Sequence, residues 1–180
     1  MKYMIASDIH GSAVYCEKLI NRFKEEKADG LILLGDILYH GPRNDLPDGY
    51  APKKVIEYLN PLRDVLTCVR GNCDAEVDQM VLDFPIMAQY SQLLYMGHDI
   101  FLTHGHKYNI DSLPNVKAGT YLIYGHTHVP LNKEQDGVIC LNPGSVSIPK
   151  SGSQRGYMTL ETAGFTWKNL DGQVYDERKF

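Results

Sequence analysis

Short runs of consecutive apolar residues recur along the chain and predict buried strands. Each run spans four or five residues and has Gly, Asp, Asn or His close to its ends, as expected for strands covered on both faces. The expected strands are Tyr3 to Ala6, Leu31 to Leu34, Val65 to Val69, Ile100 to Thr103 and Tyr121 to Tyr124.

Apolar positions at helical spacing separate the first three strands. In the first intervening segment Ser12 is placed to cap a helix, and in the second Pro52 can open one. The inward-facing positions are Tyr15, Cys16, Leu19, Ile20 and Phe23 in the first segment, and Val55, Ile56, Leu59 and Leu62 in the second. Strand and helix therefore alternate, which indicates a parallel sheet covered by helices.

The second half of the chain has the pattern of hairpins. Turns are expected at Met96 to Asp99 and at Gln135 to Gly137, and later strands near Tyr157 to Leu160 and Phe165 to Trp167. We therefore expect two stacked sheets with helices outside, which form a single domain over residues 1–180.

Composition and charge are those of an ordinary folded protein. Of the 180 residues, 43% are hydrophobic and 22% are charged, so the chain can bury a sizeable core. The formal net charge of −4 provides no global field for a polyanion, so stable binding of nucleic acid is not expected. The apolar runs are too short to cross a bilayer, and Asp8 interrupts any signal peptide, so we expect no membrane association and a cytoplasmic protein.

Four cysteines are scattered along the chain without a CxxC pair, and we expect them to be reduced thiols that are mostly buried. They are Cys16, Cys68, Cys73 and Cys140. Cys73 differs from the others because it lies between Asn72 and Asp74 in the stretch RGNCD. That stretch is compatible with an ordinary turn, with a cysteine metal ligand or with part of a catalytic site.

Oxygen and imidazole donors follow all five expected strands. In open sheets with helix crossovers the carboxyl ends of parallel strands meet at one edge, so donors far apart in sequence are expected to converge there. The donors are Asp8, His10, Asp36, Asn72, His104, His106, His126 and His128. Taken singly, an Asp at a strand end is commonly a turn former and a His a buried structural group, but all of them together favour a metal site.

The pairs Asp8/His10 and His126/His128 are each separated by one residue. If extended, the side chains of a pair point to the same side, so each pair is expected to reach a common centre. Carboxylate, imidazole and amide donors without thiolate suit Mn²⁺, Fe or Zn²⁺. The donors are too many for one ion, whereas two ions about 3.5–4 Å apart that share a carboxylate can accommodate them.

The ordered motifs DIHG, GD, GN, HGH and GHTH are together highly specific. With them the chain resembles the calcineurin-like metallophosphoesterase superfamily from residue 2 to about residue 168. The stretches GNCD, LTHGH, YGHTH and LNPGS are similar to those of its YfcE/MJ0936-type phosphodiesterase branch. The resemblance implies an α/β fold, specifically a four-layer αββα sandwich of two mixed sheets flanked by helices.

The resemblance also implies a two-metal centre that hydrolyses phosphodiester bonds. One ion would be held by Asp8, His10, Asp36 and His128, and the other by Asp36, Asn72, His104 and His126. A hydroxide that bridges the metals would attack phosphorus, with Asp36 and Asn72 essential for activity. Mn²⁺ is the expected ion, with Fe, Zn²⁺, Ni²⁺ and Mg²⁺ as alternatives. The expected partner is a small phosphodiester substrate, and the sequence leaves open whether the chain forms a homo-oligomer.

The motif around Cys73 departs from the family pattern. Most relatives with phosphatase activity have GNH[DE], whose histidine contacts phosphate and protonates the leaving oxygen, whereas here Cys73 precedes Asp74. A positioned proton donor contributes about 10²- to 10⁴-fold in rate, so substrates with poor leaving groups are expected to suffer most. His106 is the candidate for a phosphate contact or catalytic proton donor, and its alternative is an exposed or outer histidine. We expect Cys73 to be a bystander, with metal binding or proton donation as alternatives.

Several other residues carry weaker signals. Arg43, Arg70 and Lys107 are candidates for contacts with phosphate or with the rest of the substrate, and solvated or ion-paired roles are the alternative. The loop from Tyr39 to Gly49 contains two prolines and two glycines and is long enough to form a rim or lid. Ser145 in LNPGS is expected to be structural, because no GxSxG motif surrounds it.

Three functions fit these features. A dinuclear metal-dependent phosphodiesterase agrees with the complete donor set and with the missing histidine. A phosphomonoesterase or nucleotidase is the second, and a catalytically silent scaffold of the same fold is the third. Scaffolds of this kind tend to lose ligand residues, whereas every position expected from the motifs is occupied here.

Overall fold

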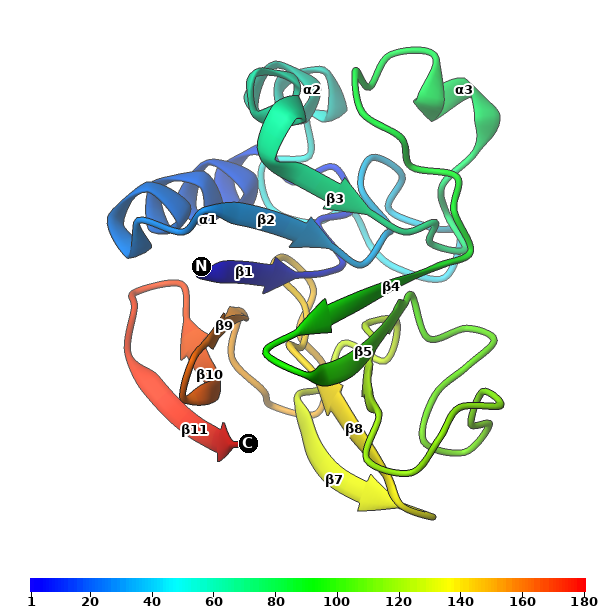
Figure 1. Ribbon diagram of the computed structural model, residues 1–180. Coiled ribbons are helices and arrows are strands. Elements are labelled where there is room, and N and C mark those ends of the chain that lie inside the picture. The colour runs from blue at the N-terminus through cyan, green and yellow to red at the C-terminus, as the bar shows by residue number, and fades with distance from the viewer.

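Two β-sheets pack face to face in the computed structural model, which describes residues 1–180 (Figure 1). The first sheet has six strands in the order β11-β10-β9-β1-β2-β3. They are β1 (Tyr3–Ala6), β2 (Gly30–Leu33), β3 (Leu66–Cys68), β9 (Gly156–Glu161), β10 (Gly164–Asn169) and β11 (Val174–Lys179). β1, β2 and β3 are parallel, whereas β9 pairs antiparallel with β1 and β10 lies antiparallel between β9 and β11.

The second sheet has five strands in the order β4-β5-β6-β8-β7. They are β4 (Tyr90–Tyr95), β5 (His98–Thr103), β6 (Tyr121–Ile123), β7 (Leu131–Gln135) and β8 (Val138–Asn142). Its three inner strands are parallel, and the edge strands β4 and β7 are antiparallel to their neighbours. Two mixed sheets are therefore present, as predicted.

Helices cover the outer face of the first sheet, where α1 (Ala13–Glu26) and α2 (Pro52–Leu59) lie side by side (Figure 1). Ser12 caps α1 by accepting a hydrogen bond from Tyr15 N at 3.3 Å, and Pro52 opens α2, both as predicted. The other helical segments are the 3₁₀ turn η1 (Asn60–Val65) and the single-turn α3 (Glu76–Gln79). None of the helices has the length and apolar character that a membrane-spanning segment needs.

The outer face of the second sheet is covered by a loop instead of the expected helix layer. Residues 104–120 contain no helix. Tyr108, Ile110 and Leu113 of this loop pack against buried Phe101 and Leu122 of the sheet. The loop is rich in Gly, Pro, Asn and Asp, and these residues favour turns over a helix.

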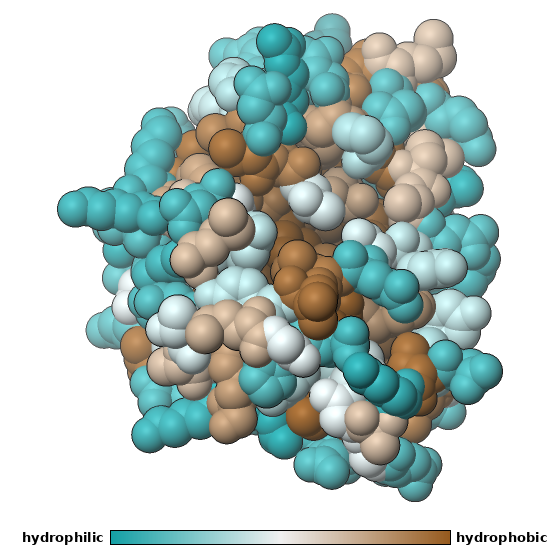
Figure 2. All heavy atoms as spheres, viewed as in Figure 1, coloured by the Kyte–Doolittle hydropathy of each residue, from teal (hydrophilic) through white to brown (hydrophobic).

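The core between the two sheets contains 14 buried residues, contributed by both. Ile5 and Ile32 of the first sheet belong to it together with Ile123 of the second. Trp167 of β10 is fully buried there, and its Nε1 donates a hydrogen bond to Asn142 O at 2.7 Å. On the face seen in Figure 2, hydrophobic residues gather in the middle, between β3 and β4, and hydrophilic residues surround them. Burial of apolar surface between the sheets holds their strand ends in a fixed relation.

The five strands predicted from apolar runs are all present, with ends shifted by at most two residues. The hairpins are present as well, with turns at Met96–Gly97 and Asp136–Gly137. Strand β11 is missing from the predictions, because Val174–Lys179 is largely exposed and mostly charged. The signal for it is the dipeptide Asp171-Gly172, a hairpin turn in which Gly172 has a φ of 86°.

The parallel strands end in register, which aligns the loops that follow them. Ala6, Leu33 and Cys68 lie side by side at the ends of β1, β2 and β3, and β5, β6 and β8 are aligned in the same way. His104 after β5 donates from Nδ1 to Leu34 O after β2 at 2.7 Å, so the edges of the two sheets meet. We call this edge the rim, which comprises residues 7–12, 34–38, 70–74, 104–106 and 125–128.

Glu26 links α1 to the first sheet away from the rim. Its carboxylate accepts hydrogen bonds from Lys2 Nζ at 2.6 Å, from Tyr157 OH at 2.8 Å and from Lys168 Nζ at 2.8 and 2.9 Å. Burial on its own would raise the pKa of Glu26, but the bonds from Lys168, Lys2 and Tyr157 outweigh it and lower the pKa to about 2. The ionised carboxylate therefore stabilises the folded state.

Replacement Glu26→Gln is expected to lower the free energy of unfolding at pH 7 by about 1–3 kcal/mol, because Lys168 loses its charged acceptor and Lys2 keeps only Glu161. The carboxyl pKa falls from an ordinary 4.5 to about 2 on folding, so its contribution is complete above pH 4.5 and is lost as the pH falls toward 2. Denaturant unfolding across this range should show the two proteins converging in acid. The matched variant Glu57→Gln, at a 60% exposed side chain, should change stability by less than about 0.5 kcal/mol.

Candidate metal centre

The backbone at the rim is left-handed at five of the predicted ligands. The φ angles are 60° at Asp8, 48° at His10, 55° at Asp36, 63° at His126 and 61° at His128. Residues other than glycine rarely adopt this conformation, and it costs about 1–3 kcal/mol at each position. The surrounding packing therefore holds the backbone at these residues in a conformation that the unfolded chain would rarely adopt.

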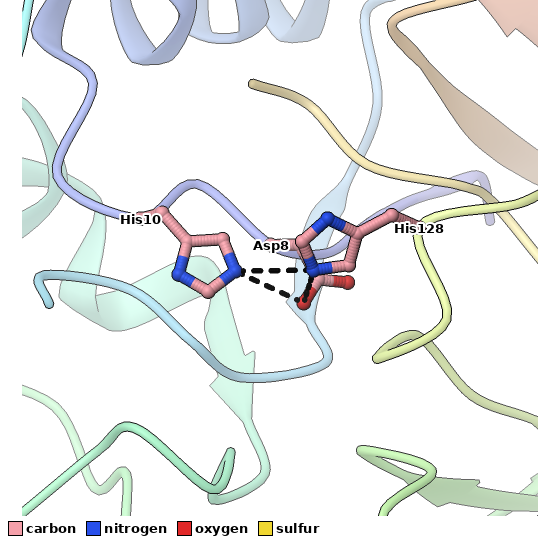
Figure 3. A group of neighbouring side chains, drawn as sticks. All are labelled: Asp8, His10 and His128. Carbon is pink, nitrogen blue, oxygen red and sulfur yellow. Dashed lines mark hydrogen bonds and ion pairs between the residues drawn. The ribbon is translucent and has the colours of Figure 1, made fainter. Parts of the chain in front are cut away.

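Asp8, His10 and His128 form the first donor cluster, in which both imidazole rings face one carboxylate oxygen (Figure 3). Asp8 Oδ1 lies 3.5 Å from His10 Nε2 and 3.2 Å from His128 Nε2, and the two Nε2 atoms are 3.2 Å apart. All three side chains are at most 3% exposed. His10 Nδ1 donates to Tyr39 O at 2.8 Å and His128 Nδ1 to Ile148 O at 2.6 Å, which leaves the lone pair of each ring on Nε2.

Asp36, Asn72, His104 and His126 form the second cluster. His104 Nε2 lies 3.3 Å from Asp36 Oδ2, 3.0 Å from Asn72 Oδ1 and 3.2 Å from His126 Nδ1. The Nδ1 atom of His104 is engaged by Leu34 O, so Nε2 is the ring atom that faces the cluster and that a metal ion would bind. Carboxylate, amide and imidazole donors thus converge on one point from four loops.

Asp36 belongs to both clusters. Its Oδ2 atom lies 3.6 Å from His10 Nε2 and 3.3 Å from His104 Nε2. Its other oxygen, Oδ1, accepts a hydrogen bond from Cys73 N at 2.8 Å, which fixes the rotation of the carboxylate. One oxygen is therefore held by the protein while the other is shared between the two donor sets.

The donor set fits divalent cations. Asp8 Oδ1 is fully buried and accepts no hydrogen bond, although two imidazole nitrogens face it. A buried carboxylate oxygen that faces lone pairs is unfavourable unless a positive charge lies among them. That charge can come from a metal ion or from protons on the imidazoles, and carboxylate with imidazole suits a divalent transition metal.

Neighbouring histidines have pKa values shifted in opposite directions. Burial on its own would lower the pKa of His104, but the hydrogen bond and charge of Asp36, with the charge of Asp8, raise it to about 9. Burial and the charge of His104 lower the pKa of His126 to about 4. Opposed shifts among packed groups are typical of functional sites.

The predicted pairing of neighbouring ligands is wrong in part. Asp8 and His10 do reach a common centre, but through left-handed backbone conformations and not through an extended strand. His126 and His128 point to different clusters, because both residues have positive φ and the chain turns between them. The division implied by the family resemblance, with His128 beside His10 and His126 beside His104, agrees with the distances.

Asp74 organises the rim through backbone contacts that the sequence did not reveal. It is 2% exposed, and its carboxylate accepts from Asp36 N at 2.8 Å, Ile37 N at 2.9 Å and Gly71 N at 2.7 Å. It therefore ties the loop after β2 to the loop after β3. Gly71 has no room for a side chain, because a Cβ atom there would collide with Asp36. In the sequence, the glycine of Gly71-Asn72 is the signal that two backbone segments approach closely here.

The motif LNPGS also organises the rim. Asn142 Nδ2 donates to Gly125 O at 2.7 Å and to Thr127 Oγ1 at 3.1 Å, which holds the loop of His126 and His128. Ser145 Oγ donates to Asp8 O at 2.9 Å and is fully buried. These contacts support the structural role predicted for Ser145.

Cys73 lies beside the shared carboxylate. Its Sγ accepts from Asn72 Nδ2 at 3.2 Å, which orients the amide so that Oδ1 faces His104. Burial, followed by the charge of Asp36, raises the pKa of Cys73 to about 12. All four cysteines are free, and the other three are buried.

The remaining candidates lie around the edge of the site. The His106 ring is exposed and lies 5.5 Å from the ring of His104, so its catalytic role stays a prediction. Arg70 donates to Asp74 O at 3.1 Å within its own loop, and Lys107 Nζ donates to Gln89 Oε1 at 3.1 Å. Arg43 belongs to the loop from Tyr39 to Gly49. It lines a hollow of about 390 Å³ together with residues of both donor clusters.

A family model of the calcineurin-like phosphoesterase superfamily domain matches residues 1–164. The chain belongs to the calcineurin-like phosphoesterase superfamily. It is 49% identical over 161 residues to Phosphodiesterase YfcE of Escherichia coli strain K12, and the matched segment covers 89% of this chain and 88% of the relative. It is 27% identical over 157 residues to Phosphodiesterase MJ0936 of Methanocaldococcus jannaschii, which covers 80% and 83% of the two chains. The predicted membership is confirmed.

Solved structures agree with this membership. The structure described as YfcE, a phosphoesterase from E. coli, superposes with a TM-score of 0.96 and 45% sequence identity over 99% of both chains. A structure of a Vps29 mutant from Entamoeba histolytica superposes with a TM-score of 0.66 at 21% identity over 100% of this chain and 99% of the other. The Vps29 likeness shows a shared fold alone. The predicted metallophosphoesterase fold with two mixed sheets is confirmed, with a loop in place of the second helix layer.

Replacement Asp74→Ala is expected to loosen the donor clusters, because three buried N–H groups lose their acceptor. The free energy of unfolding should fall by about 2–4 kcal/mol, and the affinity for Mn²⁺ by about 10- to 100-fold. Denaturant unfolding of the metal-free protein and isothermal titration with Mn²⁺ measure the two effects.

The matched control is Asp78→Ala in α3, which removes the acceptor of a hydrogen bond from Ala75 N, outside the rim. It should cost about 1 kcal/mol of stability and leave Mn²⁺ affinity unchanged. Equal metal affinity in the Asp74 and Asp78 variants would contradict the organising role of Asp74.

Proposed function

We propose that this chain is a metal-dependent phosphodiesterase with a dinuclear centre. The observation that carries the proposal is the position of Asp36 Oδ2, which faces His10 Nε2 at 3.6 Å and His104 Nε2 at 3.3 Å. The family membership and the printed name of the 49% identical relative support hydrolysis of phosphodiesters.

The chain supplies two sets of ligands in this proposal. The first ion would be held by Asp8, His10, Asp36 and His128, and the second by Asp36, Asn72, His104 and His126. Divalent cations held there would supply Lewis-acid chemistry: they would lower the pKa of a water molecule that serves as nucleophile and would offset negative charge on the phosphoryl group. The donors suit Mn²⁺, with Fe, Zn²⁺, Ni²⁺ and Mg²⁺ as alternatives.

The protein's own contribution is to hold the imidazole rings and the Asp36 carboxylate in fixed orientations. Backbone carbonyls bound to Nδ1 of His10, His104 and His128 turn Nε2 of each ring toward the donor clusters. Cys73 N holds the second oxygen of Asp36, so the carboxylate does not rotate. Groups held in this way need little reorganisation when negative charge develops on the substrate.

Position 73 limits the leaving groups that the site can expel. No imidazole is available there, because the residue is Cys73, whose Sγ contacts the Asn72 amide. The leaving oxygen must therefore depart without a strong proton donor from this loop, which favours activated or otherwise good leaving groups.

Hydrolysis of bis(p-nitrophenyl) phosphate with added Mn²⁺ is the expected activity, and a chelator should abolish it. Asp36→Asn and Asn72→Ala should each lower kcat/KM by about 10²- to 10³-fold or more, because an ion loses a ligand and the centre loses its arrangement. Metal content measured on the same samples should fall in both variants.

The control for this experiment is Asp64→Asn, at a side chain that is 91% exposed and remote from the rim, which should retain full activity. Absence of turnover with Mn²⁺, Fe²⁺, Zn²⁺, Ni²⁺ and Mg²⁺ alike would sink the proposal.

A monoesterase or nucleotidase is the second candidate, and the absence of histidine at position 73 counts against it. With the same nitrophenolate leaving group, kcat/KM for bis(p-nitrophenyl) phosphate should exceed that for p-nitrophenyl phosphate by about tenfold or more, because the second negative charge of the monoester lacks the phosphate contact of a histidine at position 73. Cys73→His should narrow the difference by restoring an imidazole, whereas Cys73→Ser should not. A strong preference of the unmodified protein for the monoester would reverse the assignment.

A catalytically silent scaffold is the third candidate, and the complete donor set argues against it. Both clusters retain buried carboxylates with imidazoles aimed at them, an arrangement that is costly to keep without a bound cation. The likeness to Vps29 concerns the fold and lends the scaffold role no support.

A further inference from the structure

The hollow beside the two donor clusters has an unusual lining. It holds about 390 Å³ and is lined by 12 residues, of which one is hydrophobic. None of the 12 is Phe, Tyr or Trp. A nucleobase is usually held by stacking on such side chains, so the hollow is poorly suited to a nucleoside and well suited to a compact hydrophilic group.

Arg43 and Lys150 supply the only ammonium and guanidinium groups of this lining. Arg43 comes from the loop after β2, where the next residue, Asn44, donates from Nδ2 to His40 O at 2.8 Å. Lys150 follows β8, and its backbone N donates to His128 O at 3.1 Å. The two cations thus come from separate segments and flank the same opening, one of them bonded through its backbone to a predicted ligand.

Neither side chain has a partner within the protein. Arg43 and Lys150 form no ion pair and no side-chain hydrogen bond, although both line a polar hollow. Arg155, close by, shows the contrast. Its guanidinium lies 3.8 Å from Asp48 and 4.2 Å from the ring centre of Tyr15, and its Nε donates to Ser147 O at 3.2 Å. Arg155 is therefore a structural cation, whereas Arg43 and Lys150 are free to bind a ligand.

The charges around the opening are unbalanced. Asp36 is the only carboxylate in the lining, and it belongs to the donor clusters. Asp45 and Asp48 line an adjacent hollow together with Arg43 but form no ion pair with it, and Asp48 lies near Arg155 instead. Two like charges at one opening repel each other unless an anion lies between them. A diester has one negative charge, at the phosphoryl group, and that charge lies at the donor clusters when the ester is in position to react.

We propose that Arg43 and Lys150 form a second anion site, which binds an additional acidic group on the ester arm of the substrate. The inference rests on the proposed phosphodiesterase function and narrows its substrate class. The substrate is a small hydrophilic phosphodiester in which one alcohol carries a carboxylate or a further phosphate. Guanidinium binds either group through two parallel hydrogen bonds, and ammonium adds a point charge.

The test uses a series of p-nitrophenyl phosphodiesters that share one leaving group. Their second ester group is a short alcohol that is neutral or carries a carboxylate, a phosphate or a quaternary ammonium group. The unmodified protein should give the highest kcat/KM with the two acidic esters and the lowest with the cationic one. A nucleoside ester of p-nitrophenyl phosphate should be no better than the neutral ester.

Variants Arg43→Gln and Lys150→Gln should each reduce the acidic-to-neutral ratio of kcat/KM by about threefold, and the double variant by about tenfold. Lys133→Gln and Arg63→Gln, at exposed side chains elsewhere, should leave the ratio unchanged. Isothermal titration with non-hydrolysable phosphonates of the acidic and neutral esters should show the same change in the ratio of Kd.

The outcomes separate the two proposals. Absence of hydrolysis of the neutral ester counts against the phosphodiesterase function, and the phosphonate titrations then still decide whether the anion site exists. Hydrolysis with an acidic-to-neutral ratio that is equal in the unmodified protein and the double variant overturns the anion site alone. A preference for the cationic or the nucleoside ester overturns it as well.

Discussion

The shared carboxylate of Asp36 is the constraint on which the rest of the site depends. One oxygen is fixed by Cys73 N, and the other faces an imidazole from each donor cluster. Asp36 comes from the first sheet and His104 from the second, so the distance between them is set by how the sheets pack. The core between the sheets is thus also the support that holds the donor atoms at ligand spacing.

Keeping this arrangement is costly for the folded protein. Five predicted ligands have left-handed backbone conformations, and Asp8 Oδ1 is buried without a hydrogen bond. Each of these features disfavours folding by roughly 1–3 kcal/mol. Asp74, Asn142 and Ser145 offset part of that cost by bonding the rim loops to each other. Five of the nine non-glycine residues with left-handed backbone lie at this rim, and backbone strain concentrated in this way is typical of functional sites.

Much of this could be predicted from the sequence, because the relevant signals are local. Buried strands such as Leu31 to Leu34 and the cap at Ser12 follow from apolar periodicity and side-chain chemistry, and the convergence of strand-end donors follows from parallel topology. The direction of each ligand does not follow, because the left-handed turns at His126 and His128 depend on contacts made by distant residues. The role of Asp74 was hidden for the same reason, since Asp36 N and Ile37 N, which donate to its carboxylate, lie on another loop.

Anomalous diffraction from crystals grown with Mn²⁺ tests the central claim most directly. Data collected above and below the manganese edge should show two peaks about 3.5–4 Å apart. One should lie beside Asp8, His10 and His128 and the other beside Asn72, His104 and His126, with Asp36 within bonding distance of both. A single peak, or two peaks that do not share Asp36, would contradict the account.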